Sequence, residues 1–135
     1  MKLLFLIGVF FAIASCNSDD EVSEQECPND LICTQEFRIL TVRIEDANGQ
    51  SVLLDSYEMT NIETGENLAF VEPATPEGQY IIADDSHVDM VERSGTAFQF
   101  QGVMNGEVVV DQAFSIGHDC CHISLVEGPE IIQLP

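Results

Sequence analysis

The sequence contains no tryptophan and very few positive charges. Its 135 residues include 4 Lys and Arg against 24 Asp and Glu, which gives a formal net charge of −20 at pH 7. Nucleic-acid binding depends on Lys and Arg that neutralise phosphates, so this balance excludes a nucleic-acid partner. It also disfavours electrostatic docking on anionic lipid. With 45% hydrophobic residues the chain is too apolar for a disordered acidic tail, and its length allows one domain.

The sequence also lacks a catalytic constellation. No serine stands in the glycine-flanked motif of a hydrolase nucleophile. Carboxylate pairs of the glycosidase type are always available among 24 acids, but a small domain without tryptophan offers little cleft to hold them. We therefore expect a protein that is not an enzyme and has no cofactor. The scarcity of aromatic platforms weakens a sugar-binding function too, since we expect Tyr57 in the core and only Tyr80 at the surface.

The chain begins like an exported protein. Lys2 precedes an unbroken apolar run from Leu3 to Ala14, which is too short for a permanent membrane span but suits the core of a signal peptide. A buried helix of the mature protein is the alternative, and it fits less well because polar residues follow the run at once. We expect residues 1–15 to be a signal peptide.

The end of this run resembles a bacterial lipobox. Ile13, Ala14 and Ser15 stand before Cys16 as one apolar and two small residues. The resemblance implies that the Cys16 thiol is acylated, that the chain is cut before it, and that the new amino group is acylated too. Several acyl chains anchor a protein firmly. The alternative is an ordinary secreted protein in which Cys16 is free or lost.

An acidic stretch follows the cysteine. Asp19, Asp20 and Glu21 are similar to the acidic export signal of Bacteroidetes surface lipoproteins. This similarity implies an outer-membrane protein that faces outward, with a periplasm-facing one as the second choice. Residues 16–26 are expected to form a lipidated tether, and a plain solvated tether is the alternative explanation of its acids.

Four cysteines remain in the expected domain of residues 27–135. They are Cys27, Cys33, Cys120 and Cys121. An even number in an exported chain indicates disulfides, which in loops of this length contribute roughly 3–5 kcal/mol. A bond between the adjacent Cys120 and Cys121 would close a strained ring, so two pairings remain, and both tie the start of the domain to its last quarter.

Strand parity favours one of these pairings. Cys121 shares its parity with Ile123 and Leu125, which should point inward. We therefore favour Cys33 with Cys121 and Cys27 with Cys120, narrowly over the swapped pairing.

The domain shows the two-residue period of β-strands. Leu40, Val42 and Ile44 alternate with polar residues, whereas Phe37 and Ile39 have the opposite parity, so we expect a bulge near Ile39. Further strands are expected at Leu53 to Met59, Asn67 to Val71, Gln79 to Ala83, Cys121 to Leu125 and Ile131 to Leu134.

The clearest hairpin turns at Asn105-Gly106, a favoured type I′ pair. Phe98 and Phe100 lead into it, and one inner face is expected to hold Val108, Val110, Phe114 and Ile116. Four glycines recur every eleven residues, which we interpret as turn spacing in a meander: Gly95, Gly106, Gly117 and Gly128. Dense turns without a helical stripe predict a single small antiparallel β-sandwich of about seven to eight strands, held by disulfides.

The strand–turn–strand of residues 42–52 and the later Thr64-Gly65 resemble small sandwiches of the transthyretin or carboxypeptidase-regulatory type. The resemblance is generic over roughly residues 38–135, and an immunoglobulin-like sandwich fits nearly as well. Such domains mostly serve as binding or structural modules, although fold alone does not assign a function.

Two clusters are candidate metal sites. His118, Cys120 and His122 offer Zn²⁺ ligands, but an extended strand would hold its ends about 13 Å apart, and disulfides would consume the thiols. We therefore favour disulfides and a loop there.

The acidic loop of Asp84, Asp85 and Asp89, with His87 among them, is a candidate for Ca²⁺. It lacks the order of an EF-hand, so a solvated loop is favoured. Asp46-Ala47-Asn48-Gly49 is better explained as a β-turn than as a calcium loop.

Taken together, these patterns predict a lipid-anchored binding or assembly module at the cell surface, without catalysis and with a protein or glycan partner that the sequence does not identify. A calcium-dependent module that uses the acidic loops is the first alternative, and a small hydrolase is the second.

Overall fold

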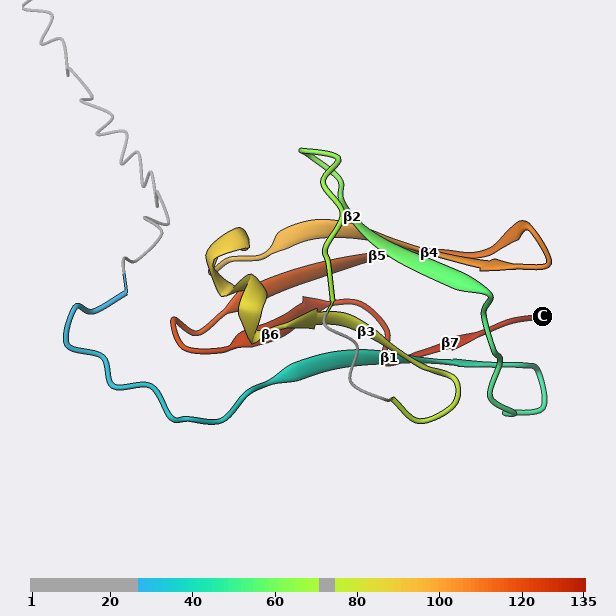
Figure 1. Ribbon diagram of the computed structural model, residues 1–135, viewed down its shortest axis with the longest axis horizontal. Coiled ribbons are helices and arrows are strands. Elements are labelled where there is room, and N and C mark those ends of the chain that lie inside the picture. Colours follow the sequence, from blue (N-terminus) through green and yellow to red (C-terminus); the bar gives the residue numbers. More distant parts are fainter. Residues whose placement is uncertain (1–26, 71–74) are drawn as a thin grey trace, which may run out of the picture.

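The computed structural model describes residues 27–70 and 75–135. The expected signal peptide, Cys16 and the tether of residues 16–26 lie outside the described residues. The described chain forms a β-sandwich of two facing sheets with a short 3₁₀ helix at one end (Figure 1). Within these residues, no helix is long and apolar enough to cross a membrane.

The smaller sheet has the strand order β3-β1-β7 and the larger sheet has the order β2-β4-β5-β6. The elements are β1 (Ile39–Glu45), β2 (Ser56–Asn61), β3 (Gln79–Asp84), η1 (Asp85–Met90), β4 (Thr96–Met104), β5 (Glu107–His118), β6 (Ile123–Glu127) and β7 (Ile131–Gln133). The predicted fold class, a small all-β sandwich held by disulfides, is confirmed.

One strand pair departs from the antiparallel pattern. β7 runs parallel to β1, with Ile132 beside Ile44, whereas the other four strand pairs are antiparallel. The departure arises because the chain crosses from the larger to the smaller sheet between β6 and β7. The first and last strands of the domain therefore lie side by side.

The core lies between the sheets and follows much of the predicted alternation. Val42 and Ile44 of β1 are fully buried, and so are Phe98 and Phe100 of β4. Each such side chain contributes roughly 1.5–3 kcal/mol to folding through its burial. The register of β1 against β3 shifts just after Leu40, close to the bulge that was expected near Ile39.

The β4–β5 hairpin forms as predicted, but its inner face differs at one position. Asn105 and Gly106 have the positive φ angles of a type I′ turn, 54° and 81°. Val108, however, is 55% exposed. Gly102 pairs with Val110 while the next residue, Val103, pairs with Val108, so β5 carries one extra residue and its parity reverses there.

Gly117 lies inside a strand and not in a turn, against the expectation from the glycine spacing. It is buried near the end of β5, and the expected loop begins after it. A Cβ atom here would lie 2.6 Å from the carbonyl oxygen of Arg93, so the missing side chain lets the β3–β4 connection pack directly on β5.

Three further expectations are corrected. Leu53 is 60% exposed, because Leu54 packs against the core in its place and β2 begins only at Ser56. Tyr80 is buried, because its hydroxyl donates to the Val52 carbonyl at 2.9 Å and accepts the Leu54 N–H at 2.7 Å. The described residues of the strand expected from Asn67 to Val71 form only an isolated bridge between Thr60 and Asn67.

We expect Gly117→Ala to lower the free energy of unfolding by about 1–3 kcal/mol, because the new methyl group meets backbone that has no room to give way. Urea unfolding monitored by circular dichroism measures this loss. Gly106→Asn is the matched control: its Cβ meets nothing within 4 Å, and Asn tolerates a positive φ. Equal stabilities of the two variants would contradict the packing role of Gly117.

Candidate functional site

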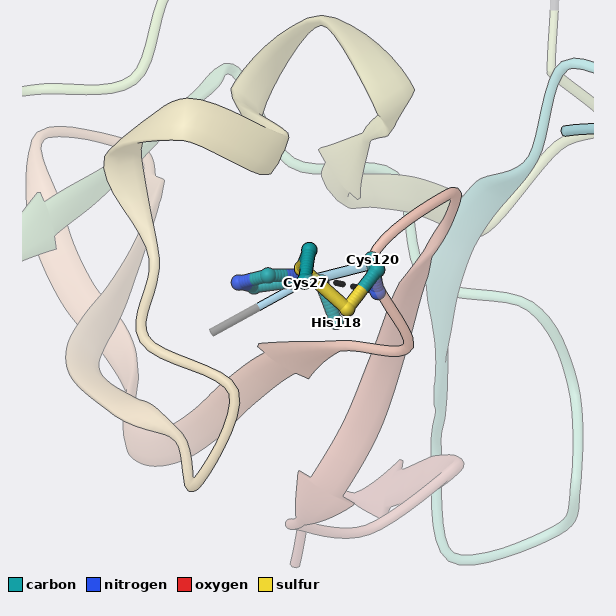
Figure 2. A group of neighbouring side chains, drawn as sticks. All are labelled: Cys27, His118 and Cys120. Carbon is teal, nitrogen blue, oxygen red and sulfur yellow. Dashed lines mark hydrogen bonds between the residues drawn. A yellow bond between two sulfur atoms is a disulfide. The ribbon is translucent and has the colours of Figure 1, made fainter. Parts of the chain in front are cut away.

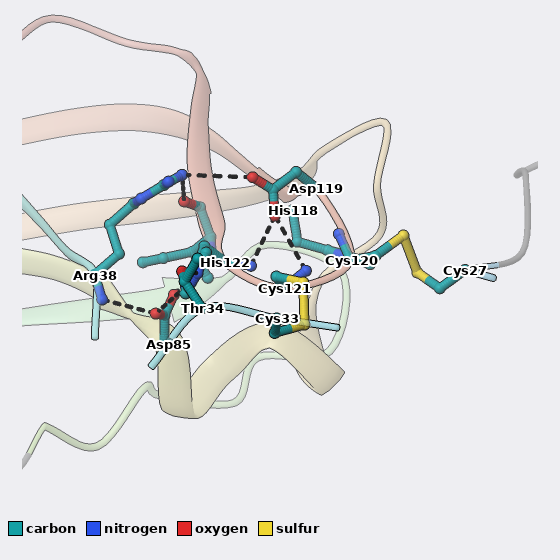
Figure 3. The surroundings of a disulfide bond; sticks show 11 residues. Cys27, Cys33, Thr34, Arg38, Asp85, His118, Asp119, Cys120, Cys121 and His122 are labelled. Carbon is teal, nitrogen blue, oxygen red and sulfur yellow. Dashed lines mark hydrogen bonds and ion pairs between the residues drawn. A yellow bond between two sulfur atoms is a disulfide. The ribbon is translucent and has the colours of Figure 1, made fainter. Parts of the chain in front are cut away.

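The polar residues singled out in the sequence gather at the end of the sandwich where the described chain begins. Three segments meet there: residues 27–38, the 3₁₀ helix η1, and the turn that joins β5 to β6 (Figure 3). Disulfides join Cys27 to Cys120 and Cys33 to Cys121, with Cα atoms 5.6 and 5.4 Å apart. This is the pairing that strand parity favours.

A buried histidine links these segments. His122 is only 7% exposed, and its Nδ1 lies 2.6 Å from Oδ2 of Asp85 in η1. Its Nε2 lies 3.0 Å from the Thr34 hydroxyl. An ionised carboxylate only accepts hydrogen bonds, so the imidazole donates Nδ1–H to Asp85, and its Nε2 shares a hydrogen bond with the Thr34 hydroxyl. The ring thereby fastens residues 27–38, the segment through which the described chain enters the fold (the entering segment), to the sandwich.

Asp85 is held in its ionised form by several donors. Its carboxylate accepts the backbone N–H of Arg38 at 2.7 Å and that of Ile123 at 2.9 Å, besides the His122 ring. Burial by itself would raise the pKa of Asp85, but the Arg38 N–H, His122 and the Ile123 N–H together keep that pKa below its usual value of 3.8.

Asp119 shapes the turn between β5 and β6. Its Oδ1 accepts the N–H groups of Cys121 at 3.0 Å and of His122 at 2.8 Å. The His122 N–H is the main reason that the pKa of Asp119 lies below its usual value, and the Cys121 N–H lowers it further against the opposing effect of burial. The Arg38 guanidinium lies 3.7 Å from the other carboxylate oxygen. This turn aims His122 inward.

The two histidines of the candidate zinc cluster are separated by that turn. His118 stays at the end of β5, where its Nδ1 accepts the N–H of Cys120 at 3.0 Å and its ring lies beside the Cys27–Cys120 disulfide (Figure 2). His122 is engaged by Asp85 and Thr34 instead. The structure therefore does not bring His118, Cys120 and His122 together around one ion.

The three acids of the candidate calcium loop do three different things. Asp84 caps η1: its Oδ1 accepts the Ser86 N–H at 2.9 Å and lies 3.0 Å from Nδ1 of His87. Asp85 accepts the hydrogen bond from His122, and Asp89 is exposed on η1. Because protein donors occupy the first two carboxylates, the loop is a helix start and not the solvated loop that the sequence favoured.

Thr34 and Arg38 belong to this site but were not predicted from the sequence. Thr34 follows Cys33 and His122 follows Cys121, so the favoured disulfide already implies that these two neighbours lie close together. No comparable signal marks the backbone of Arg38 as a donor to Asp85.

Comparisons of the chain with protein-family models, with curated proteins and with solved structures find no match. The geometry of this end of the sandwich therefore carries the functional argument.

We expect Asp85→Asn to destabilise the fold by about 1–3 kcal/mol at pH 7, because the amide cannot replace a carboxylate that accepts several hydrogen bonds. The folded state lowers the pKa of Asp85, so its contribution is present above pH 3.8 and is lost as the pH falls through the lower folded value.

Chemical denaturation of wild type and variant from pH 7 down to pH 2.5 should therefore show that the difference between their free energies of unfolding, the gap, becomes smaller in acid. Asp89→Asn, which changes an exposed acid of the same helix, is the control. A gap that stays constant with pH would contradict the role given to the Asp85 charge.

Proposed function

We propose that this protein is a lipid-anchored module of the outer membrane, facing outward, which binds or assembles with a protein or glycan partner and performs no chemistry of its own. The lipobox-like residues ending at Cys16 and the acids that follow support the anchor and its location. The domain architecture supports the binding role, since small sandwiches of the transthyretin-like or immunoglobulin-like type mostly serve as binding or structural modules.

The observation that carries the proposal is the double covalent closure of the entering segment. A pull on a tether that ends at residue 26 would reach Cys27 first and pass through its disulfide into the β5–β6 turn of the larger sheet. The bond from Cys33 to Cys121 secures the same segment a second time. The force would then not act on β1. Without the disulfide it would pull on β1 and break the hydrogen bonds of this strand one after another. This arrangement suits a domain that is held by its N-terminus.

The far end of the sandwich is then left for a partner. The β4–β5 hairpin, the turn after β1 and the C-terminus lie at the end opposite the entering segment (Figure 1). The turn after β1 is well formed, because Oδ1 of Asp46 accepts the N–H groups of Asn48 and Gln50 at 2.8 and 2.9 Å. Rigid loops at the end away from an anchor form a suitable binding surface.

We expect Cys16→Ala to move the protein from the membrane fraction to the soluble fraction, because the acyl chains have lost their attachment point. Fractionation of the native host followed by immunoblotting measures this. Continued membrane retention would refute the lipid anchor.

Replacement of Asp19, Asp20 and Glu21 by their amides is the matched control. That variant keeps Cys16 and should stay in the membrane fraction, but an epitope placed after Pro135 should no longer be reached by antibody on intact cells. An epitope that remains accessible would contradict the role of the acids in export while leaving the anchor intact.

One observation favours a small hydrolase as a second candidate. The Thr34 hydroxyl, the His122 ring and the Asp85 carboxylate follow one another in the order nucleophile, base and orienting acid, at 3.0 and 2.6 Å. Both carboxylate oxygens of Asp85 are also fixed by backbone N–H groups. Thr34 itself lies on the exposed entering segment, where the same contacts fasten the chain.

A fluorophosphonate probe separates the two functions. As the binding module that we propose, the protein should give no covalent adduct by intact mass. An adduct on Thr34 that is absent from Thr34→Val and His122→Asn, but present in the surface control Thr64→Val, would replace our proposal with the hydrolase.

A further inference from the structure

The Cys27–Cys120 disulfide, one of the two that close the end of the sandwich where the described chain begins, has a histidine beside it. The ligand atoms of Cys27, His118 and Cys120 all lie within 4.8 Å of one another, and within residues 27–70 and 75–135 this is the one group of three side chains placed to hold a metal ion (Figure 2). The two sulfurs are bonded to each other, so the group holds no thiolates in this state. We infer that reduction of the Cys27–Cys120 bond turns this corner into a zinc site with two thiolates and one imidazole.

The ligand set suits zinc. Zn²⁺ prefers Cys sulfur at about 2.3 Å and His nitrogen at about 2.0 Å in a tetrahedron. Two sulfurs bound in this way lie about 3.8 Å apart, so a pair that has just been reduced needs only a small outward movement. Three protein ligands leave the fourth position for water or for a ligand from a partner. His118 and Cys120 come from the same turn, and Cys27 comes from the entering segment.

The second disulfide keeps the three ligands together after reduction. Cys33 lies six positions after Cys27, and its partner Cys121 is the direct neighbour of Cys120. The two new thiols would therefore be tethered through a short closed path, which gives them a high effective concentration for each other and for a shared ion. In the disulfide-bonded state the Cys120 N–H donates to Nδ1 of His118 and holds the ring close. Zinc binding through this nitrogen would replace that hydrogen bond, because the same lone pair serves both.

The Cys33–Cys121 bond does not offer the same chemistry. The nearby imidazole is His122, whose two nitrogens are committed to Asp85 and Thr34. Reduction of that bond would also release Thr34 from its place beside His122. Reduction of the Cys27–Cys120 bond can thus leave the Cys33–Cys121 bond and the contacts of His122 in place.

The redox step is a thiol–disulfide exchange with a dithiol reductant. One thiolate of the reductant attacks a sulfur of the Cys27–Cys120 bond and forms a mixed disulfide, and its second thiol then displaces the protein thiol. The reductant leaves as a disulfide, while Cys27 and Cys120 gain two electrons and two protons. Zn²⁺ then binds both sulfurs as thiolates and releases those two protons.

Cobalt(II) is the probe for this site, because thiolate ligands give it a strong charge-transfer absorption. The full mature protein is treated with increasing dithiothreitol and desalted without oxygen, and alkylation with mass analysis counts its thiols. The fraction with thiols at Cys27 and Cys120 should bind one Co²⁺ with the thiolate band, and Zn²⁺ should abolish the band. The oxidised protein should show none.

Variants test the ligand set. Cys27→Ser should abolish the thiolate band of the two-sulfur site, and His118→Ala should weaken Co²⁺ binding by more than about tenfold. Asp89→Asn, which changes an exposed acid of η1, should bind like the wild type. Circular dichroism of each reduced protein shows that the sandwich remains folded.

Two results would overturn the inference. One is a folded protein with free thiols at Cys27 and Cys120 that gives no thiolate band with Co²⁺. The other is a band of unchanged affinity in His118→Ala, which would mean that the thiols bind the ion without the site proposed here. A protein with both disulfides removed by Cys→Ser changes should bind no Co²⁺ at micromolar concentration, which excludes capture by its acidic surface.

Discussion

The constraint on which the rest of the structure depends is the pair of disulfides between the start of the domain and two adjacent cysteines. Residues 27–38 form no strand and bury little of their own surface, so hydrophobic packing alone would not hold them. The bonds from Cys27 and Cys33 reach across 93 and 88 residues to the β5–β6 turn. They limit the unfolded chain by closing long loops, and they also fix where the chain enters its sandwich. The contact between Thr34 and His122 depends on this closure.

The polar network then completes what the disulfides begin. Asp85 comes from η1, His122 from the β5–β6 turn and Arg38 from the residue before β1, so one carboxylate joins three parts of the chain that are far apart in sequence. Buried polar groups cost stability unless they are paired, and here each nitrogen of the His122 ring has a partner. The same arrangement explains why a catalytic-looking line of three residues can arise for structural reasons. A histidine that joins a hydroxyl on one segment to a carboxylate on another fastens both segments, whether or not chemistry occurs there.

The sequence predicts this architecture where local parity governs it and fails where tertiary contacts decide. Val42, Ile44, Phe98 and Phe100 lie inward because inward and outward residues alternate regularly from Val42 to Ile44 and along β4. The prediction for Val108 is wrong because one inserted residue reverses the parity of β5. The prediction for Gly117 is wrong because its need to be small comes from the backbone of Arg93, a neighbour in space and not in the strand. At the site, Asp85 and His122 both stand out in the sequence but as ligands of two different metals. Their 37-residue separation hides the contact, which needs η1 and the β5–β6 turn to meet. The contact of Thr34 with His122 could have been predicted, because Thr34 follows Cys33 and His122 follows Cys121, the partner of Cys33.

The scarcity of cations explains how this acidic chain uses its carboxylates. Three arginines are present in the domain against an excess of acids, so ion pairs satisfy few of them. Asp46, Asp85 and Asp119 instead accept backbone N–H groups, and all three have pKa values below the usual range for that reason, although burial opposes the shift. At Asp46 and Asp119 both of these backbone bonds go to Oδ1, so this oxygen is engaged in holding its turn. Of the acids that look like ion ligands in the sequence, Asp46 caps a turn and Asp84 caps η1. Asp85 accepts hydrogen bonds from Arg38, His122 and Ile123, and Asp89 is exposed. Strong negative charge in such a domain is then evidence about its surface and solubility, and the group proposed above to bind a metal, Cys27, His118 and Cys120, contains no carboxylate.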